Sequence, residues 1–310
     1  MTNDRVSAPS IHVAPLAELA SSKTQSIWRE FWSYFRENKG AVLGLRVFCF
    51  IILVAIFADV IAPHDFKAQM PGALKLPPFW QEKGSLQFLL GTDDVGRDIL
   101  SRIIHGSRYS LIIGFVVVVI SVFFGVLMGL VAGFFGGWLD ALIMRLMDII
   151  LSIPSLPLAL VVVSVLRQDI SSVVIAFAVI YQPHFVRLTR AAVMAEKNRE
   201  YVIASRLAGA SKLRLMVKTI LPNCMAPIIV QGTLTFSNAV LDVAALGFIS
   251  QGVPPPAPEW GTMLASAREF ISSAWWIVTF PGLAILITVL AINLIGDGLR
   301  DALDPKMKRS

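Results

Sequence analysis

Charged residues are scarce in this sequence. Of its 310 residues only 15% are charged, whereas 55% are hydrophobic, and a soluble domain carries about 25% charged residues. Residues 111–135 and 274–295 contain no charged side chain, and about 20 apolar residues are enough to cross a bilayer as a helix. The composition therefore excludes an ordinary soluble domain and predicts a protein that crosses a membrane several times.

The side-chain patterns that support catalysis are also missing. No Gly-Lys dipeptide occurs, which excludes the phosphate-binding loop of an ATPase. The four histidines are scattered, and neither Cys49 nor Cys224 pairs with one at the spacing of a metal site. No Ser-His-Asp arrangement is evident. We therefore expect no catalytic residue, metal or cofactor in this chain, and an energy source that is a partner protein or an ion gradient.

The expected spanning elements are helices, because in lipid every backbone polar group must be satisfied within its own segment. We predict an all-α, polytopic membrane protein with six transmembrane helices. Prolines at 154, 157 and 183 are expected to kink the third and fourth of them. The six apolar runs are 47–58, 111–135, 149–166, 170–186, 226–241 and 274–295.

Lysine and arginine indicate the orientation. Five basic residues precede residue 41, eight lie between Arg187 and Lys218, and four follow Gly298. Six spans place these groups on one side, so both termini are expected in the cytosol. Six basic residues in the loop 63–110 oppose this assignment, although five acidic residues accompany them. We attribute the net charge of +6 to topology and membrane lipid, and expect no nucleic-acid partner.

The long loop between the first two spans is rich in Gly, Asp and Arg near its end. An ion or phosphate site is one interpretation, and turns with local salt bridges are the favoured one. The predicted parts of the chain are a cytosolic arm at 1–40, a first transmembrane helix at 41–62, a periplasmic loop at 63–106, a transmembrane domain at 107–297 and a cytosolic tail at 298–310.

The cytosolic arm contains a predicted amphipathic helix at 26–39. Its aromatic residues Trp28, Phe31, Trp32 and Phe35 share one helix face. The helix is expected either in the membrane interface or against the cytosolic side of the protein, and the sequence favours neither. The preceding residues 1–25 are rich in Ser, Ala and Thr and are expected to be poorly ordered.

Small residues recur at every fourth position of the second apolar run. Ser121, Gly125, Gly129 and Gly133 fall on one helix face. Because the hydrophobic effect is weak between helices in lipid, small side chains let two helices approach closely instead. We predict a packing face here, against a helix of this chain or of a second subunit.

The fifth apolar run is the most polar. Gln231, Thr235, Asn238 and Asp242 share one helix face, and polar groups in a bilayer normally face the bundle or a water-filled path. These side chains are predicted either to line a translocation path or to form hydrogen bonds between helices. A further hypothesis is that Asp242 senses a cationic group in transit.

A polar, basic segment at 196–222 separates the fourth and fifth apolar runs. Its pattern predicts two short helices that are joined at Gly209, where a left-handed residue ends the first, and stopped by Pro222. Ala204 and Ser205 are small enough for close contact with another protein. The alternative interpretation is an amphipathic connector that binds nothing.

This segment resembles the cytosolic loop by which permease subunits of ABC importers hold their ATPases. That loop has the form Glu-Ala-Ala, three residues, Gly, nine residues, then Ile-x-Leu-Pro. Three further stretches, at 90–98, 254–264 and 296–305, resemble the peptide/nickel branch of the family, and within it the dipeptide permeases. In the loop the matching residues are Ala204, Gly209, Leu221 and Pro222, and the departures are Ile203, Ser205 and Thr219.

The resemblance, which covers roughly residues 27 to 308, implies the fold of type I ABC importer permeases and transport of dipeptides or short peptides. It also implies a homologous permease subunit, two cytosolic ATPases that bind ATP and Mg, and a periplasmic peptide-binding protein as partners. The residues that it places at the ATPase contact are Glu200, Ala204, Ser205, Gly209, Leu221 and Pro222.

Two other functions fit the residues alone. A secondary transporter driven by an ion gradient would use Asp242 and its polar neighbours, although the internal repeats common in such folds are not evident. A membrane scaffold would use the segment 196–222 to recruit cytosolic proteins without any transport. The sequence does not identify the cargo, because a permease for haem or a metal complex would have a similar sequence.

Overall fold

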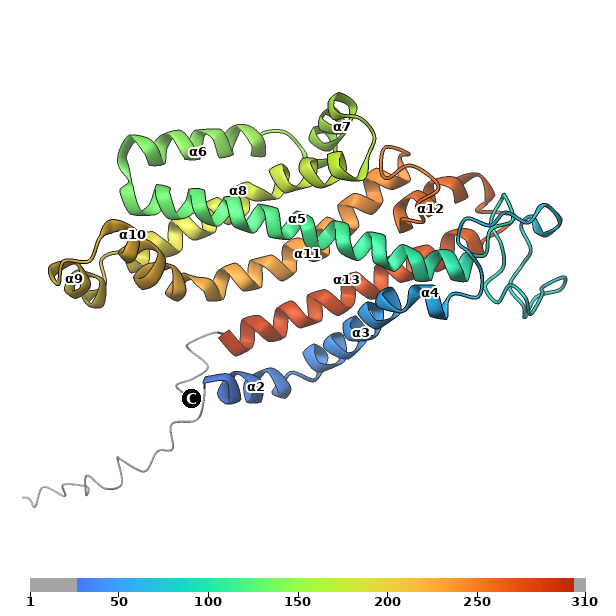
Figure 1. The fold of residues 1–310 in the computed structure, drawn as a ribbon, viewed down its shortest axis with the longest axis horizontal. Helices are drawn as coiled ribbons and strands as arrows, with labels where there is room; N and C mark the ends of the chain where they lie inside the picture. Colours follow the sequence, from blue (N-terminus) through green and yellow to red (C-terminus); the bar gives the residue numbers. More distant parts are fainter. Residues whose placement is uncertain (1–26, 304–310) are drawn as a thin grey trace, which may run out of the picture.

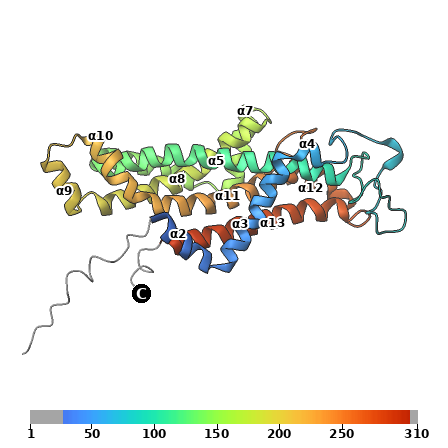
Figure 2. The same cartoon turned by 60° about the horizontal axis from the view of Figure 1, so that its bottom comes forward.

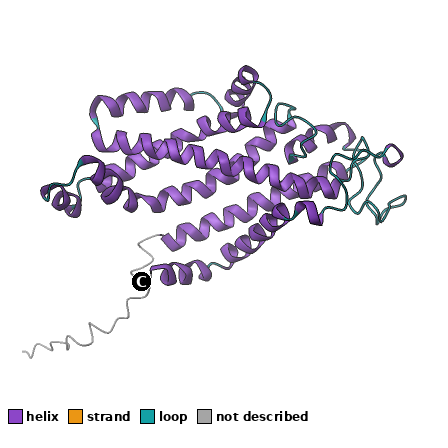
Figure 3. Cartoon of the chain, in the orientation of Figure 1, coloured by secondary structure: helices purple, strands orange, loops and turns teal. Residues whose placement is uncertain are grey.

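The computed structural model describes residues 27–303, in which helices alternate with loops (Figures 1 and 3). Strand pairing in that range is limited to one isolated bridge between Thr92 and Asp98. The predictions for residues 1–25 and for the end of the tail lie outside the described residues.

The longer helices are α2 (Ile27–Glu37), α3 (Lys39–Ile56), α5 (Ile99–Phe135), α6 (Gly137–Leu151), α7 (Ser155–Leu166), α8 (Ile170–Glu196), α11 (Met225–Phe248) and α13 (Trp276–Leu303). The shorter elements are α4 (Ala58–Ile61), η1 (Pro71–Ala73), α9 (Glu200–Leu207), α10 (Lys212–Arg214), η2 (Leu215–Ile220), η3 (Leu221–Cys224), α12 (Trp260–Ala267) and η4 (Arg268–Phe270).

Five helical runs of the described chain are long and apolar enough to cross a membrane, and a sixth is present if α6 and α7 together form one span. The prediction of an all-α, polytopic protein is confirmed. The third run differs from the kinked helix expected over 149–166, because α6 and α7 are separate helices bent by 92°. Pro154 causes the break, since it lacks an N–H group and disfavours the helical conformation of the residue before it. Pro183, in contrast, lies inside the continuous helix α8.

The centre of the bundle is the contact between α5 and α8 (Figure 1). A Cβ atom on Gly125 would lie 2.4 Å from Cβ of Phe185, and one on Gly129 would lie 2.6 Å from the carbonyl oxygen of Val186. Only glycine allows the two backbones to come this close. The predicted packing face is confirmed, and its partner is a helix of this chain.

Helices α2 and α3 lie along α13 on one side of the bundle (Figure 2). The Asn38 side chain accepts a hydrogen bond from the N–H of Ala41, which caps α3, and donates one to Asp301 at 3.0 Å. Phe35 of α2 is buried at this junction, whereas Trp32 is 42% exposed. The amphipathic helix therefore packs against the protein itself through Phe35.

The long loop lies at one end of the molecule, and α9 and α10 lie at the other (Figure 1). Helix α5 begins at Ile99, so the loop is shorter than the predicted range 63–106. The helix starts early because Asp98 caps it: its carboxylate accepts a hydrogen bond from the N–H of Ser101 at 3.1 Å. The pattern of apolar residues does not reveal this cap.

Ion pairs order this loop, as the favoured interpretation predicts. Asp93 is buried and pairs with Arg97 at 2.6 Å and with Arg102 at 3.7 Å. The adjacent Asp94 forms no ion pair within residues 27–303, and its Oδ1 is buried without a hydrogen-bond partner there. The two neighbouring carboxylates therefore have different surroundings.

Candidate functional site

Helix α9 projects from the end of the bundle and is mostly exposed. Val202 is its buried side chain, while Leu207 is 83% exposed. Of the residues predicted to contact an ATPase, Glu200 and Ala204 are exposed and Ser205 is half-buried. Ile203 and Leu213 are exposed on the same projection, and several exposed apolar side chains on one projection are more typical of a surface that binds another protein than a single one is.

Gly209 ends α9 in the left-handed conformation that the sequence predicts, with φ of +83°. The N–H of Gly209 donates to the carbonyl of Arg206 at 3.0 Å, and the N–H of Ala210 donates to the carbonyl of Ser205 at 3.1 Å. This pair of bonds is the Schellman motif. A Cβ atom at Gly209 would meet nothing within 4 Å, so the backbone conformation, and not space, calls for glycine.

The second half of the segment differs from the prediction that Pro222 stops the helix. Ser211 caps α10, and the π-helical turn η2 and the 3-10 turn η3 then lead into α11 within one helical run, 212–248. Pro222 lies in the first turn of η3, where its missing N–H group breaks no helical bond. It therefore marks a change of helix type.

A buried apolar cluster fastens this segment to the bundle. The ammonium of Lys197 adds a hydrogen bond to the carbonyl of Gly133 at 2.8 Å. The segment is therefore a projection whose inner side continues into α5 and α8. The cluster contains Leu130, Phe185, Val193, Val202, Leu215, Met216, Ile220, Cys224 and Ile228.

Tyr201 ties α9 to the end of α8. Its hydroxyl donates to the Glu196 carboxylate at 2.5 Å. Burial, helped by this hydrogen bond, raises the pKa of Tyr201 to about 12. The phenol is therefore neutral at physiological pH and remains a hydrogen-bond donor.

The four polar residues of α11 have different surroundings. The Gln231 amide donates to the hydroxyl of Thr235 at 3.3 Å, and Thr235 is 1% exposed. Asp242 accepts a hydrogen bond from Tyr181 of α8, whereas Asn238 is exposed. The structure thus brings Gln231 and Thr235 together, binds Asp242 to a neighbouring helix and leaves Asn238 accessible.

One buried acid was not identified from the sequence. Glu259 is 1% exposed and caps α12, accepting the N–H of Gly261 at 2.9 Å and that of Thr262 at 2.8 Å. Burial raises the pKa of Glu259, while these hydrogen bonds act in the opposite direction. One feature of the sequence could have identified Glu259: it lies in the stretch 254–264, which resembles the peptide/nickel branch of the family.

Within residues 27–303, no group of three His, Cys, Asp or Glu side chains is placed to hold a metal ion. His105 and Arg108 instead contact the Asp59 carboxylate at 3.3 Å and 3.0 Å. Both cysteines are free. In the described part of the chain, these side chains act in packing and local ion pairs.

The described chain thus combines a helical bundle with five or six candidate membrane spans and an exposed helix–glycine–helix projection. Residues 125–309 match the family described as binding-protein-dependent transport system inner membrane component. Residues 26–78 match the N-terminal transmembrane domain of oligopeptide transport permease C. The chain belongs to this family of ABC importer permeases.

Close relatives carry related names. The chain is 57% identical, over 97% of its length and 99% of the relative's, to the di/tripeptide transport system permease protein DppC of Pseudomonas aeruginosa. It is 58% identical, over 91% of its length and 94% of the relative's, to the dipeptide transport system permease protein DppC of Escherichia coli. The predicted family, the permease function and the assignment as a non-catalytic subunit are confirmed, and the ion-gradient alternative is not favoured.

Proposed function

We propose that this chain carries dipeptides or short peptides across the bacterial inner membrane as one of two homologous permease subunits. Both termini and α9 face the cytosol, and a periplasmic peptide-binding protein delivers the cargo to the opposite end. The names of the relatives support the peptide cargo. The basic residues of the arm, the segment 187–218 and the tail support the orientation.

Two cytosolic ATPases, which bind the ATP and Mg, dock on the α9–α10 projection in this proposal. The observation that carries it is the exposure of Leu207, Ala204 and Ile203 on a helix whose inner side packs against η2, within the buried apolar cluster. An ATPase that moves α9 therefore also moves the cluster beneath it. The contact with the ATPase is shaped by Glu200, Ser205 and Gly209. The projection joins α11 at Leu221 and Pro222. The chain itself needs no cofactor.

The polar face of α11 forms part of the path in the same proposal. Asn238 is exposed, and Asp242 and Gln231 are half-buried, so these three remain accessible to cargo or water. Thr235 is 1% exposed and acts by holding Gln231. The homologous subunit supplies the opposite wall.

The test compares two leucines of similar exposure at opposite ends of the molecule. Leu207→Asp places a charge on α9, and Leu86→Asp places one in the long loop, where Leu86 is 80% exposed. The whole transporter, in vesicles with its binding protein, is assayed for dipeptide uptake with ATP and an uncoupler. ATPases that co-purify with the complex are quantified in parallel.

We expect uptake to require ATP and to survive the uncoupler. Leu207→Asp should lower uptake by about ten-fold or more, with loss of the ATPases, because a charge in an apolar contact is costly. Leu86→Asp should leave the amount of bound ATPase unchanged, because the long loop that contains Leu86 lies at the end of the molecule opposite α9. Full ATPase binding by Leu207→Asp would place the docking surface elsewhere. ATPases that bind a complex without dipeptide uptake would favour the scaffold.

A further inference from the structure

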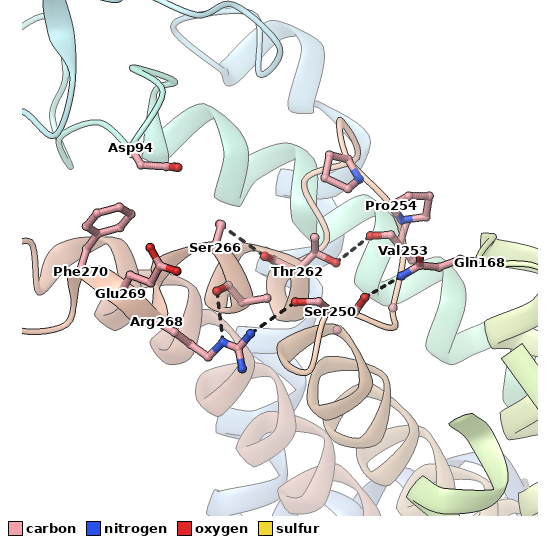
Figure 4. A pocket seen from close by; sticks show the side chains of 14 residues that line it. Asp94, Gln168, Ser250, Val253, Pro254, Thr262, Ser266, Arg268, Glu269 and Phe270 are labelled. Carbon is pink, nitrogen blue, oxygen red and sulfur yellow. Dashed lines mark hydrogen bonds between the residues drawn. The ribbon is translucent and has the colours of Figure 1, made fainter. Parts of the chain in front are cut away.

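A cavity of about 730 Å³ opens at the end of the molecule opposite α9. It lies between the chain after α11, the end of α12, η4, the long loop and Gln168 in the link between α7 and α8 (Figure 4). Its volume falls within the range of about 300–1,000 Å³ that is usual for small-molecule sites. The coupling projection and the polar face of α11 do not contribute to it.

Two carboxylates border one side of this cavity, those of Asp94 and Glu269 (Figure 4). Asp94 Oδ1 is buried and has no hydrogen-bond partner in the described chain. Arg102 lies near enough to act on Asp94 electrostatically, but it contacts Asp93 and not Asp94. Glu269 is exposed and forms no ion pair within residues 27–303. Neither carboxylate has an ion-pair partner in the described chain, so together they place uncompensated negative charge at this edge of the cavity, and a cationic group would be favoured here.

A guanidinium borders the same cavity. Arg268 donates to the carbonyl of Ala265 at 3.4 Å and to the hydroxyl of Ser250 at 3.5 Å, and it lies 5.2 Å from the ring of Phe248. These two bonds are long, and a guanidinium has five N–H donors in a fork that fits a carboxylate. These contacts therefore hold Arg268 in place and leave other N–H groups of its guanidinium able to donate to a ligand.

The remaining wall is apolar and stiff. Pro254, Pro255 and Phe270 line it, and the Gln168 amide fixes the loop by donating to the carbonyl of Ser250 at 2.7 Å. The cavity thus combines groups for a cation, a group for an anion and an apolar surface between them. That combination matches a short zwitterion better than a single ion.

We propose that this cavity binds the charged ends of a short free peptide at the outer face of the permease. Asp94 and Glu269 accept hydrogen bonds from its α-ammonium group, and Arg268 donates to its α-carboxylate. The apolar wall accommodates a side chain. This inference rests on the proposed peptide transport, because it assigns to that cargo a site that the permease itself supplies.

The test measures binding to the complete transporter in lipid nanodiscs, without the binding protein. The probes are radiolabelled alanylalanine, its N-acetyl form and its C-terminal amide, each measured by equilibrium dialysis. The wild type should bind alanylalanine about ten-fold more tightly than either blocked form, since each blocked form loses a charge-assisted contact. Glu269→Gln should weaken binding of alanylalanine and of the amide, but not that of the N-acetyl form. Arg268→Gln should weaken binding of alanylalanine and of the N-acetyl form, but not that of the amide.

Glu82→Gln is the matched control, because Glu82 is exposed in the long loop and does not line the cavity. Glu269 and Arg268 are exposed, so their variants are expected to fold. Equal binding of all three probes by the wild type, or unchanged discrimination in both variants, would overturn the assignment. Capture of the binding protein by the same nanodiscs is measured separately, and its loss in the variants with unchanged peptide binding would overturn the assignment in favour of a protein-docking surface. Dipeptide uptake with the binding protein present, measured separately, tests the proposed function on its own.

Discussion

The hydroxyl of Tyr181 donates a hydrogen bond to Oδ2 of Asp242 at 2.7 Å. This bond connects α8, which packs against the glycine stripe of α5, with the polar face of α11. The carboxylate of the fifth span therefore has a partner within the chain. Of the two interpretations of that polar face, hydrogen bonding between helices describes Asp242 in this structure.

Removing the donor should destabilise the protein. Tyr181→Phe leaves the half-buried Asp242 oxygen without its partner, at a cost of about 1–3 kcal/mol. Asp242→Asn keeps an oxygen that accepts from Tyr181 and should cost less. Thermal unfolding of the purified protein in detergent compares the two, and equal losses would show that the hydrogen bond does not stabilise the fold. Unchanged uptake and selectivity in Asp242→Asn would eliminate cation sensing by this residue.

The glycine stripe on α5 should tolerate no side chain. Gly125→Ala would place a methyl group 2.4 Å from Cβ of Phe185, and the resulting overpacking should cost about 1–3 kcal/mol. Gly232→Ala on α11 is the matched control, because its nearest neighbour would be 3.9 Å away. We expect the unfolding temperature to fall for Gly125→Ala and to be unchanged or higher for Gly232→Ala. The reverse order would contradict the packing of α5 against α8.

Gly209 should be replaceable only by a residue that accepts a positive φ. Gly209→Val should disturb the end of α9, since the left-handed conformation costs an L-residue about 1–2 kcal/mol and a β-branched side chain tolerates it poorly. Gly209→Asn should be milder because Asn tolerates this conformation. ATPase co-purification and ATP-dependent uptake measure the effect. Equal loss in both variants would indicate that the side chain's size matters and that φ does not.

Glu259 should make stability depend on pH. Burial raises its pKa above the ordinary value of 4.5, so the folded protein binds this proton more tightly than the unfolded chain. The resulting stabilisation is present at pH below 4.5 and is lost as pH rises toward the folded pKa. The unfolding temperature of the wild type, relative to that of Glu259→Gln, should therefore fall as pH rises from 4.5 toward neutrality. A constant difference between the two proteins would show that the pKa of Glu259 is not raised. Glu82→Gln, at an exposed site, should track the wild type.

Features that depend on neighbouring residues in the chain were predictable. Uncharged runs mark the spans because their length and composition alone decide whether they fit a bilayer. Gly125 and Gly129 are four residues apart and therefore lie on one helix face, which predicted a packing surface. Gly209 predicted a helix end, because glycine readily adopts the left-handed conformation that ends a helix. The resemblance of 196–222 to a coupling loop then placed the chain in its family.

Features that depend on distant residues were not predictable. The pattern did not reveal that α6 and α7 are bent by 92°, nor that the helix runs through Pro222 into α11. It also did not reveal the partner of the glycine stripe, the bond from Tyr181 to Asp242, or the cavity that gathers Asp94, Glu269 and Arg268.

By itself, the sequence determined which segments are apolar enough to cross a membrane and that α9 ends at Gly209, since hydropathy and backbone preference act within one segment. The tertiary structure alone decided which helices touch, which carboxylates are paired and which polar groups share a cavity. The physical reason is that contact distance, burial and hydrogen bonding are properties of pairs of residues brought together by folding, and no local pattern specifies them.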